Sequence, residues 1–161
     1  MATFKTGNKA GKYFDPAAKK TVFDYMNLPH KTIHDYHGYA GVDPSNPVQD
    51  MMDTSAQFGK TTGVQLRHFI LSFSPEELDD PTAANEIGYR VACHIAQEYQ
   101  CVYAVHEDGA NLHIHLMFNS VSYLDGHRYY GRREEFYSLF NWLKALLRRY
   151  GIYYLVYVPN R

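Results

Sequence analysis

The chain has 161 residues, of which 45% are hydrophobic and 20% charged, a balance typical of one folded domain and not of a disordered segment. Its net charge of −1 does not by itself indicate a nucleic-acid-binding protein. No apolar run approaches the ~18 residues of a membrane helix, and the N-terminus is too polar for a signal peptide. We therefore expect a cytoplasmic protein without membrane insertion. Its cysteines, Cys93 and Cys101, are too widely spaced for a thiolate zinc site.

The first 64 residues predict two short helices joined by a long irregular loop. Asp15-Pro16 is typical of a helix start, and the helix that follows should end near residue 27. Residues 30–47 are rich in Gly, Pro, His and Tyr, a composition that indicates a loop. Asn46-Pro47 then begins the second helix.

From residue 65 onward the hydrophobic periodicity predicts an α+β fold. Its order of strand, helix, strand, strand, helix, strand is that of the ferredoxin-like split βαβ arrangement. In that topology the first and third strands are central neighbours in an antiparallel sheet, both helices cover one face, and the other face is open. The expected strands are residues 65–73, 101–106, 112–123, 128–130 and 152–158, and the expected helices are residues 81–99 and 133–150.

The predicted strand at residues 112–123 carries two histidines on one face. Because alternate side chains share a face of a strand, His113 and His115 point away from the apolar residues between and around them. His106 ends the preceding strand, and a turn at residues 108–111 would place it opposite His113. Three neutral imidazoles could hold one divalent cation and leave positions open for substrate. The alternative is a pair of surface histidines on a half-exposed strand.

Three further side chains belong to the same candidate site. His68 and Ser72 lie on the neighbouring central strand and should face the same space. Asp108 could fix the tautomer of a histidine ligand, but an Asp-Gly pair is also what a turn requires. Both roles remain open for Asp108.

The histidine spacing resembles a known metal motif. His106-Glu107-Asp108, then His113-Ile114-His115, then Asn119 is similar to the motif of the HUH endonucleases, and in particular of the MobP-type relaxases of conjugative and mobilisable elements. Residues 23–32, 57–75 and 119–131 resemble other segments of the same family. Two positions depart from the pattern: Asn111 stands where many relatives have a further histidine, and His30 where the family usually has glutamate.

The resemblance implies that Tyr25 is the nucleophile of a DNA relaxase, with Tyr36 and Tyr39 as the alternatives. A phenol has an ordinary pKa of ~10, so a tyrosine needs a nearby cation or base to attack at neutral pH. The implied reaction is strand-specific nicking of single-stranded DNA at an origin of transfer. It would leave a covalent 5′-phosphotyrosine and a free 3′-OH, which can be rejoined.

The resemblance also implies a cofactor, partners and a domain arrangement. The histidines would bind Mn²⁺ or Mg²⁺, with Asn119 in a supporting role, and the domain would work with accessory relaxosome and coupling proteins in the bacterial cytoplasm. We expect residues 1–161 to be one relaxase domain at the N-terminus of a longer protein, with the tyrosine in residues 1–64 and the metal site in residues 65–158. The basic residues expected to contact DNA are Lys60, Arg67, Arg128 and Arg132.

Three other interpretations remain open. A replication-initiator HUH endonuclease would share this chemistry, but such enzymes usually place their tyrosine after the histidine motif, whereas Tyr25 precedes it. A non-catalytic module could bind single-stranded nucleic acid through some of the 15 tyrosines and nine phenylalanines and would need no cation. A metal-dependent phosphodiesterase would hydrolyse its substrate and leave no protein-bound DNA.

Overall fold

A computed structural model describes residues 1–7, 12–29, 32–108 and 111–159. The strands are β1 (Ala2–Thr6), β2 (Thr32–Ala40), β3 (Leu66–Phe73), β4 (Cys101–Asp108), β5 (Asn111–Asn119) and β6 (Leu155–Val158). The α-helices are α1 (Ala18–Met26), α2 (Pro47–Gln57), α3 (Pro81–Ile95) and α4 (Arg133–Arg148), and a 3-10 turn, η1 (Lys12–Phe14), precedes α1. The part of the chain described is therefore an α+β fold, as predicted.

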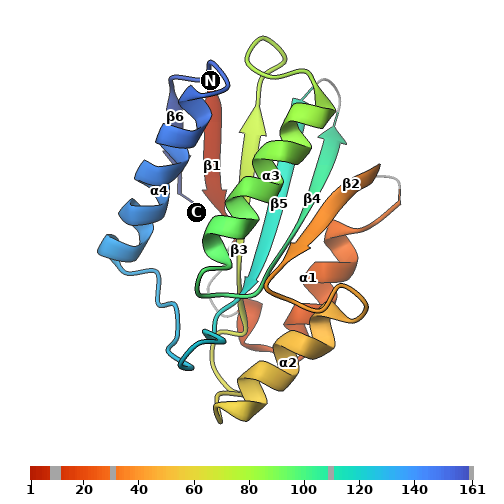
Figure 1. Cartoon of the computed structure of the whole chain (residues 1–161), viewed down its shortest axis with the longest axis vertical. Coiled ribbons are helices and arrows are strands. Elements are labelled where there is room, and N and C mark those ends of the chain that lie inside the picture. Colours follow the sequence, from red (N-terminus) through yellow and green to blue (C-terminus); the bar gives the residue numbers. More distant parts are fainter. Residues whose placement is uncertain (8–11, 30–31, 109–110, 160–161) are drawn as a thin grey trace.

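The strands form one six-stranded sheet in the order β2-β4-β5-β3-β1-β6. The predicted central pair is confirmed, because β3 and β5 are antiparallel neighbours over their whole length. The ferredoxin-like order is extended in two places. β2 adds a strand beside β4, and β1 lies between β3 and β6. β1 runs parallel to β6 and antiparallel to β3, so the sheet is mixed (Figure 1).

The two long helices cover one face of the sheet, as expected. Figure 1 shows α3 and α4 lying across the near face, and the larger apolar core is packed beneath them. Along β5 the alternate residues Leu112, Ile114, Leu116 and Phe118 all belong to this core. α4 is held over β1 by aromatic contacts, with the Phe4 and Phe136 ring centroids 5.9 Å apart.

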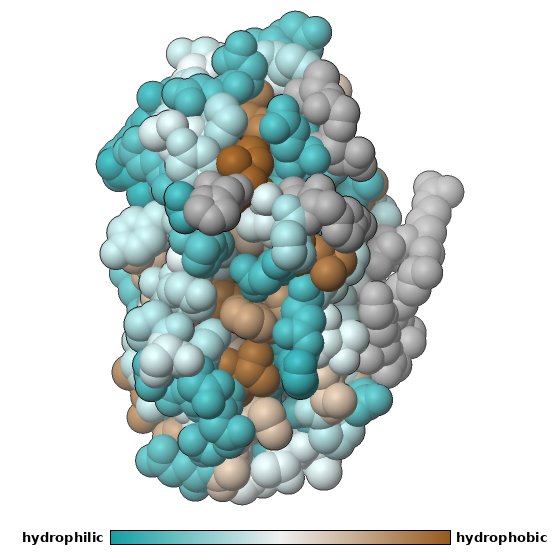
Figure 2. Space-filling view, turned by 90° about the vertical axis from the view of Figure 1, so that its right-hand side faces the viewer, coloured by the Kyte–Doolittle hydropathy of each residue, from teal (hydrophilic) through white to brown (hydrophobic). Residues whose placement is uncertain are grey.

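The opposite face is partly covered by the N-terminal helices. A second, smaller core joins Val22 and Met26 of α1 and Met51 of α2 to Val102 and Met117 of the sheet. Seen from the side of β2 and α1, the surface is mostly hydrophilic, with a narrow band of hydrophobic residues (Figure 2). None of the described helices is both long and apolar enough to cross a membrane.

The predicted helix boundaries follow from local chemistry that the structure retains. The Asp80 carboxylate accepts a hydrogen bond from the backbone N–H of Thr82 at 3.0 Å, so it caps α3 at its predicted start. Gly151 has a φ of +75°, the left-handed conformation expected after the end of α4. The predicted α3 was too long at its C-terminal end, because the helix ends at Ile95, residues 96–98 form a turn and residue 99 a bend.

Three predictions in the N-terminal segment and the late hairpin were wrong. The stretch 30–47 is not all loop, because Thr32–Ala40 forms β2 and pairs with β4. β1 was not predicted, because five residues are too short to show a clear alternation. Residues 128–130 do not form a strand: Arg128 makes an isolated bridge to Val121 and the ladder goes no further.

A buried lysine fixes α1 to the sheet. Lys19 is 1% exposed, and its Nζ donates hydrogen bonds to Ser55 Oγ at 3.0 Å and Gln65 Oε1 at 3.4 Å. Both partners are neutral, and burial lowers the pKa of Lys19 from 10.5 to about 8, with a further contribution from the positive charge of Arg128. The α1 helix is thus tied to α2 and β3 through a group whose charge is costly to bury.

Lys19 should make the stability of the domain rise with pH. Because folding lowers the pKa of Lys19, the unfolded chain binds more protons than the folded chain between pH 8 and 10.5. Below pH 8 the folded protein bears the whole free-energy cost of burying a charged lysine. As the pH rises through this interval the buried amine loses its proton and that cost disappears. The relief amounts to about 3 kcal/mol over the whole interval. Urea unfolding of Lys19→Met and wild-type protein from pH 7 to 10 should show this rise only in the wild type, and parallel curves would contradict the assignment.

Candidate active site

The pairing of strands brings the predicted histidines to one face of the sheet. His106 of β4 lies directly opposite His113 of β5, which is the register expected from the hairpin. His115 lies between Ala104 of β4 and Ile70 of β3 in the ladder. Because the neighbouring apolar residues of β5 face α3 and α4, these three histidines share the face that α1 and α2 partly cover.

The imidazole rings are packed closely together at the centre of this face. The ring centroids of His106 and His115 are 4.1 Å apart, and those of His113 and His115 are 6.5 Å apart. His68 joins the group, because its Nε2 lies 3.0 Å from Nδ1 of His115. His68, His106 and His115 are nearly fully buried, whereas His113 is half-buried.

A chain of hydrogen bonds indicates the tautomer of each imidazole. The hydroxyl of Tyr13 donates to the Gly7 carbonyl at 2.7 Å, so it is left to accept from Nδ1 of His68, 3.3 Å away. His68 Nε2 then accepts from Nδ1 of His115, which places the lone pair of His115 on Nε2. His106 Nε2 must donate to the Met26 carbonyl at 2.5 Å, because a carbonyl oxygen only accepts. The lone pair of His106 is therefore on Nδ1.

Tyr25 stands beside these rings although it lies about eighty residues earlier in the sequence. Its ring centroid is 6.1 Å from that of His115 and 6.4 Å from that of His106, in both cases edge to face. The side chain is 43% exposed, so a strand of DNA could reach its hydroxyl. The following residue, Met26, is fully buried and its carbonyl receives the His106 bond, which holds the last turn of α1 against β4.

The two alternative tyrosines lie away from the histidines. The hydroxyl of Tyr36 lies 2.9 Å from Oγ1 of Thr82 in α3, so this side chain belongs to the helix-covered face. Tyr39 is on the same face as the histidines, but it pairs with Val102, four positions along β4 from His106. Of the three candidates, the structure places only Tyr25 in ring contact with His106 and His115.

The predicted supporting residues separate into two groups. Ser72 lies opposite His113 in the ladder and His68 contacts His115, so both are next to the histidines. Asn119 is not: its Nδ2 donates to the Met51 carbonyl at 3.1 Å and to Gln100 Oε1 at 3.2 Å, and it joins α2 to the sheet. Asp108 pairs with Asn111 where the β4–β5 hairpin turns.

The predicted DNA contacts do not gather around the histidines. Lys60 donates to the carbonyl of Gly126, and Arg128 donates to the carbonyl of Lys60 at 3.3 Å, so these two cations stabilise a loop. Arg67 lies next to His68 on β3 but points to the opposite, helix-covered face, where it donates to the Tyr129 carbonyl at 3.2 Å. Arg132 precedes α4 and stacks on the Tyr130 ring, 5.0 Å from its centroid.

The structure adds two residues that the sequence pattern did not single out. Tyr13 is 4% exposed, and burial raises its pKa to about 12, so its hydroxyl stays neutral, donating to Gly7 and accepting from His68. Lys5 pairs with Ile70, which pairs with His115, and it brings an exposed ammonium group to the histidine face. Neither could be found without the position of β1, because a single lysine or tyrosine carries no periodic signal.

The clustered histidines are suitable metal ligands, but their rings are not arranged around one ion. Imidazole nitrogens are good ligands for divalent transition metals, and three of the rings lie on two adjacent strands. Within residues 1–7, 12–29, 32–108 and 111–159, however, no set of three or more His, Cys, Asp or Glu side chains is gathered so that it could hold one ion. The His106 and His115 rings are tilted by 33° with their centroids 4.1 Å apart, and coordination of one ion by both would require the rings to turn.

Comparison with known proteins shows the family of this chain. A family model described as "Relaxase: MobA/VirD2-like, nuclease domain" matches residues 25–152, a range that begins at Tyr25 and includes all the clustered histidines of β4 and β5. A protein of Staphylococcus aureus named Protein rlx is 38% identical over 82 residues, which cover 51% of this chain and 25% of the relative. A second Staphylococcus aureus Protein rlx is 28% identical over 135 residues, which cover 84% of this chain and 39% of the relative.

The chain thus spans well under half the length of these curated relatives. The family match, by contrast, covers most of the chain, including Tyr25 at the end of α1 and the histidine strands β4 and β5. On that match, this chain belongs to the MobA/VirD2-like relaxase family and comprises its nuclease domain.

Proposed function

We propose that this domain nicks and rejoins single-stranded DNA at an origin of transfer, with Tyr25 as the nucleophile, for conjugative transfer of a plasmid or integrative element. The observation that carries the proposal is the contact of the Tyr25 ring with His106 and His115. A half-exposed tyrosine beside buried imidazoles, at the end of a helix fixed to the sheet, combines an accessible nucleophile with an ordered surrounding. The relaxase family membership supports the same substrate class.

The proposed reaction exchanges one phosphate ester for another and consumes no water. Attack by the Tyr25 oxygen on phosphorus forms a tyrosine–phosphate ester and breaks the bond from phosphorus to the 3′ oxygen. The phenol loses its proton to a base, and the departing 3′ oxygen takes up a proton. Because one ester replaces another, the free energy of the bond is retained and the reverse attack by the 3′-OH can rejoin the strand. This property suits strand transfer and not degradation.

The histidines would hold a divalent ion, Mn²⁺ or Mg²⁺. The lone pairs of His106 and His115 and the position of His113 on the same face support this assignment. His68 would lie behind His115 and orient its ring. Such an ion polarises phosphate oxygens and stabilises the negative charge of the transition state. The chain itself contributes the orientation of the rings, through the Tyr13–His68–His115 bonds, and the position of Tyr25.

Replacing the nucleophile should abolish covalent attachment. Tyr25→Phe removes only the hydroxyl, so the protein–DNA adduct with a cognate single-stranded oligonucleotide should fall roughly 10⁴-fold or more. Affinity for the same oligonucleotide should change by no more than about threefold, because an exposed ring is retained. Denaturing gels and intact mass measure the adduct.

Tyr36→Phe is the matched control, because its hydroxyl contacts Thr82 on the helix-covered face. It should form the adduct at the wild-type rate. A Tyr25→Phe protein that still forms a denaturant-resistant adduct would show that another residue is the nucleophile. Cleaved DNA without any adduct in the wild type would instead indicate a hydrolytic phosphodiesterase.

Replacing a histidine should weaken metal binding. His113→Ala and His115→Ala should each raise the dissociation constant for Mn²⁺ by at least about tenfold in titration calorimetry. His113 is the cleaner test, because it is half-buried and its loss leaves a smaller cavity than the loss of His115. His94→Ala is the control, since His94 stacks on Trp142 with a centroid distance of 3.8 Å, away from the histidine strands. Wild-type affinity in both test variants would remove the metal site from the proposal.

A further inference from the structure

A groove on the helix-covered face combines exposed aromatic rings with arginines. It has a volume of about 460 Å³ and is lined by residues of β1, β3, β6 and the first turns of α4. Tyr130, Tyr137 and Tyr157 line it and are 58%, 47% and 38% exposed. Large aromatic rings gathered on a surface are the part of a protein most often used for binding. The volume is within the ~300–1,000 Å³ range of ligand pockets.

The positive charges of this groove are only partly balanced, because one carboxylate, Glu135, acts electrostatically on Arg67 and accepts from the Arg132 backbone N–H at 3.2 Å. Arg67 and Arg133 line it, and Arg132 lies beside it on Tyr130. Among the described residues no salt bridge includes any of these three arginines, and no acidic side chain lines the groove. The Nε atom of Arg67 is buried and finds no hydrogen-bond partner in the described part of the chain. A buried donor of this kind is costly unless a ligand satisfies it.

Two of the arginines are also held against aromatic rings. The guanidinium of Arg133 lies 5.7 Å from the centroid of Tyr137, one helical turn later, and Arg67 lies 5.6 Å from the centroid of Tyr129. Stacking on an aromatic face restricts a long side chain, so less conformational entropy is lost when it binds an anion. Alternating guanidinium groups and exposed rings are suited to phosphates and flat bases.

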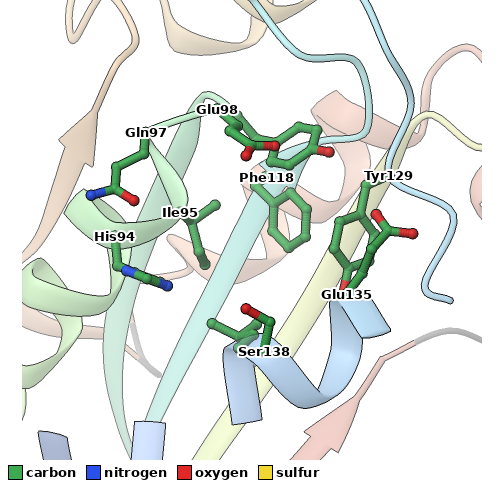
Figure 3. A pocket seen from close by; sticks show the side chains of 10 residues that line it. His94, Ile95, Gln97, Glu98, Phe118, Tyr129, Glu135 and Ser138 are labelled. Atoms are coloured by element: carbon green, nitrogen blue, oxygen red, sulfur yellow. The ribbon is translucent and has the colours of Figure 1, made fainter. Parts of the chain in front are cut away.

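A neighbouring cavity differs from the groove in charge, and the difference indicates which of the two could bind DNA. Tyr129 separates the groove from a cavity of about 280 Å³, where the carboxylates of Glu98 and Glu135 flank Phe118 and Tyr129 (Figure 3). No lysine or arginine lines that cavity, so it would repel a phosphate. Of the two cavities, only the groove has the charge to hold DNA.

The groove is connected to the histidine face through the end of β1. Thr6 lines the groove, and the next residue, Gly7, donates its N–H to the His68 carbonyl at 2.6 Å, which continues the pairing of β1 with β3. An added Cβ at Gly7 would lie 2.6 Å from Nδ1 of His68, so the backbone approaches the histidines as closely as possible there.

We propose that this groove binds a nucleotide of the single strand away from the cleavage point, with its base stacked on Tyr130 and Tyr137 and its phosphate held by Arg67 and Arg133. The proposal rests on the function proposed above, since it assigns a further contact to the same DNA. Stacking on aromatic rings tolerates any base, so the groove would add affinity without adding sequence specificity.

Binding of fluorescein-labelled dT20, measured by anisotropy, tests the groove without any cleavage. Tyr137→Ala should weaken binding about tenfold, because one stacking contact is lost, and Tyr137→Phe, which keeps the ring, should bind like the wild type. Arg133→Gln should weaken binding and reduce the slope of log K against log[salt] by about one. Both residues are exposed, so the variants should remain folded, which circular dichroism checks.

Matched controls are Tyr89→Ala, an exposed tyrosine of α3 at 53%, and Arg148→Gln, at the far end of α4. Both should bind dT20 like the wild type. If Tyr137→Ala and Arg133→Gln bind dT20 with unchanged affinity, the groove does not bind DNA. The same conclusion follows if the control variants lose as much affinity as these two. The binding of dT20 is measured without cleavage, so a failure of Tyr25 as the nucleophile would leave the dT20 result unaffected.

Discussion

The site depends on one hydrogen bond between two parts of the chain that are far apart in sequence. The His106 imidazole donates to the Met26 carbonyl at 2.5 Å, and this bond joins the last turn of α1 to the central strand β4. A carbonyl at the end of a helix has no partner within the helix. The Met26 carbonyl accepts from Thr32 Oγ1 at 2.7 Å as well as from His106, so both of its lone pairs are used. The same contact determines where Tyr25 lies, because Tyr25 is the residue before Met26.

Two other anchors keep α1 in place, and they differ in kind. Val22 and Met26 pack against the sheet and contribute ordinary apolar burial. Lys19 contributes a buried cation, and burying its charge is unfavourable. Its hydrogen bonds to Ser55 and Gln65 nevertheless fix α1 relative to α2 and to the start of β3. A helix held only by apolar contacts could slide along the sheet, whereas the lysine and the His106 bond fix its position at both ends.

The histidine strand and the central part of the sheet could be predicted, because they depend on alternation of side chains along a strand and on short hairpins between neighbouring strands. Alternation along β5 separates His113 and His115 from the apolar face, and a short hairpin fixes the register with His106. The position of Tyr25 could not be derived in that way. It depends on how α1 docks, a contact between residues eighty positions apart, and only the resemblance of the segment 23–32 to relaxases indicated it.

β2 and β1 were missed for physical reasons. β2 contains Asp35, with a φ of +70°, and its pairing with β4 shifts register between Thr32 and His37, so its side chains do not alternate regularly. Its Gly38 has no side chain because the ring of Tyr103 fills the space: an added Cβ would lie 2.5 Å from it. β1 is stabilised by strands on both sides and not by its own sequence.

The insertion of β1 between β3 and β6 affects how the domain can fold. Ala2 pairs with Leu155, so nearly the whole chain must be present before the sheet is complete, and this contact is among the most non-local that the chain can make. Closing such a loop carries a large entropic cost early in folding and slows it. The contact of Gly7 with His68, by contrast, comes from the pairing of β1 with β3 and needs only the first 73 residues. A nascent chain could therefore order this border of the histidine face well before the β1–β6 edge of the sheet forms.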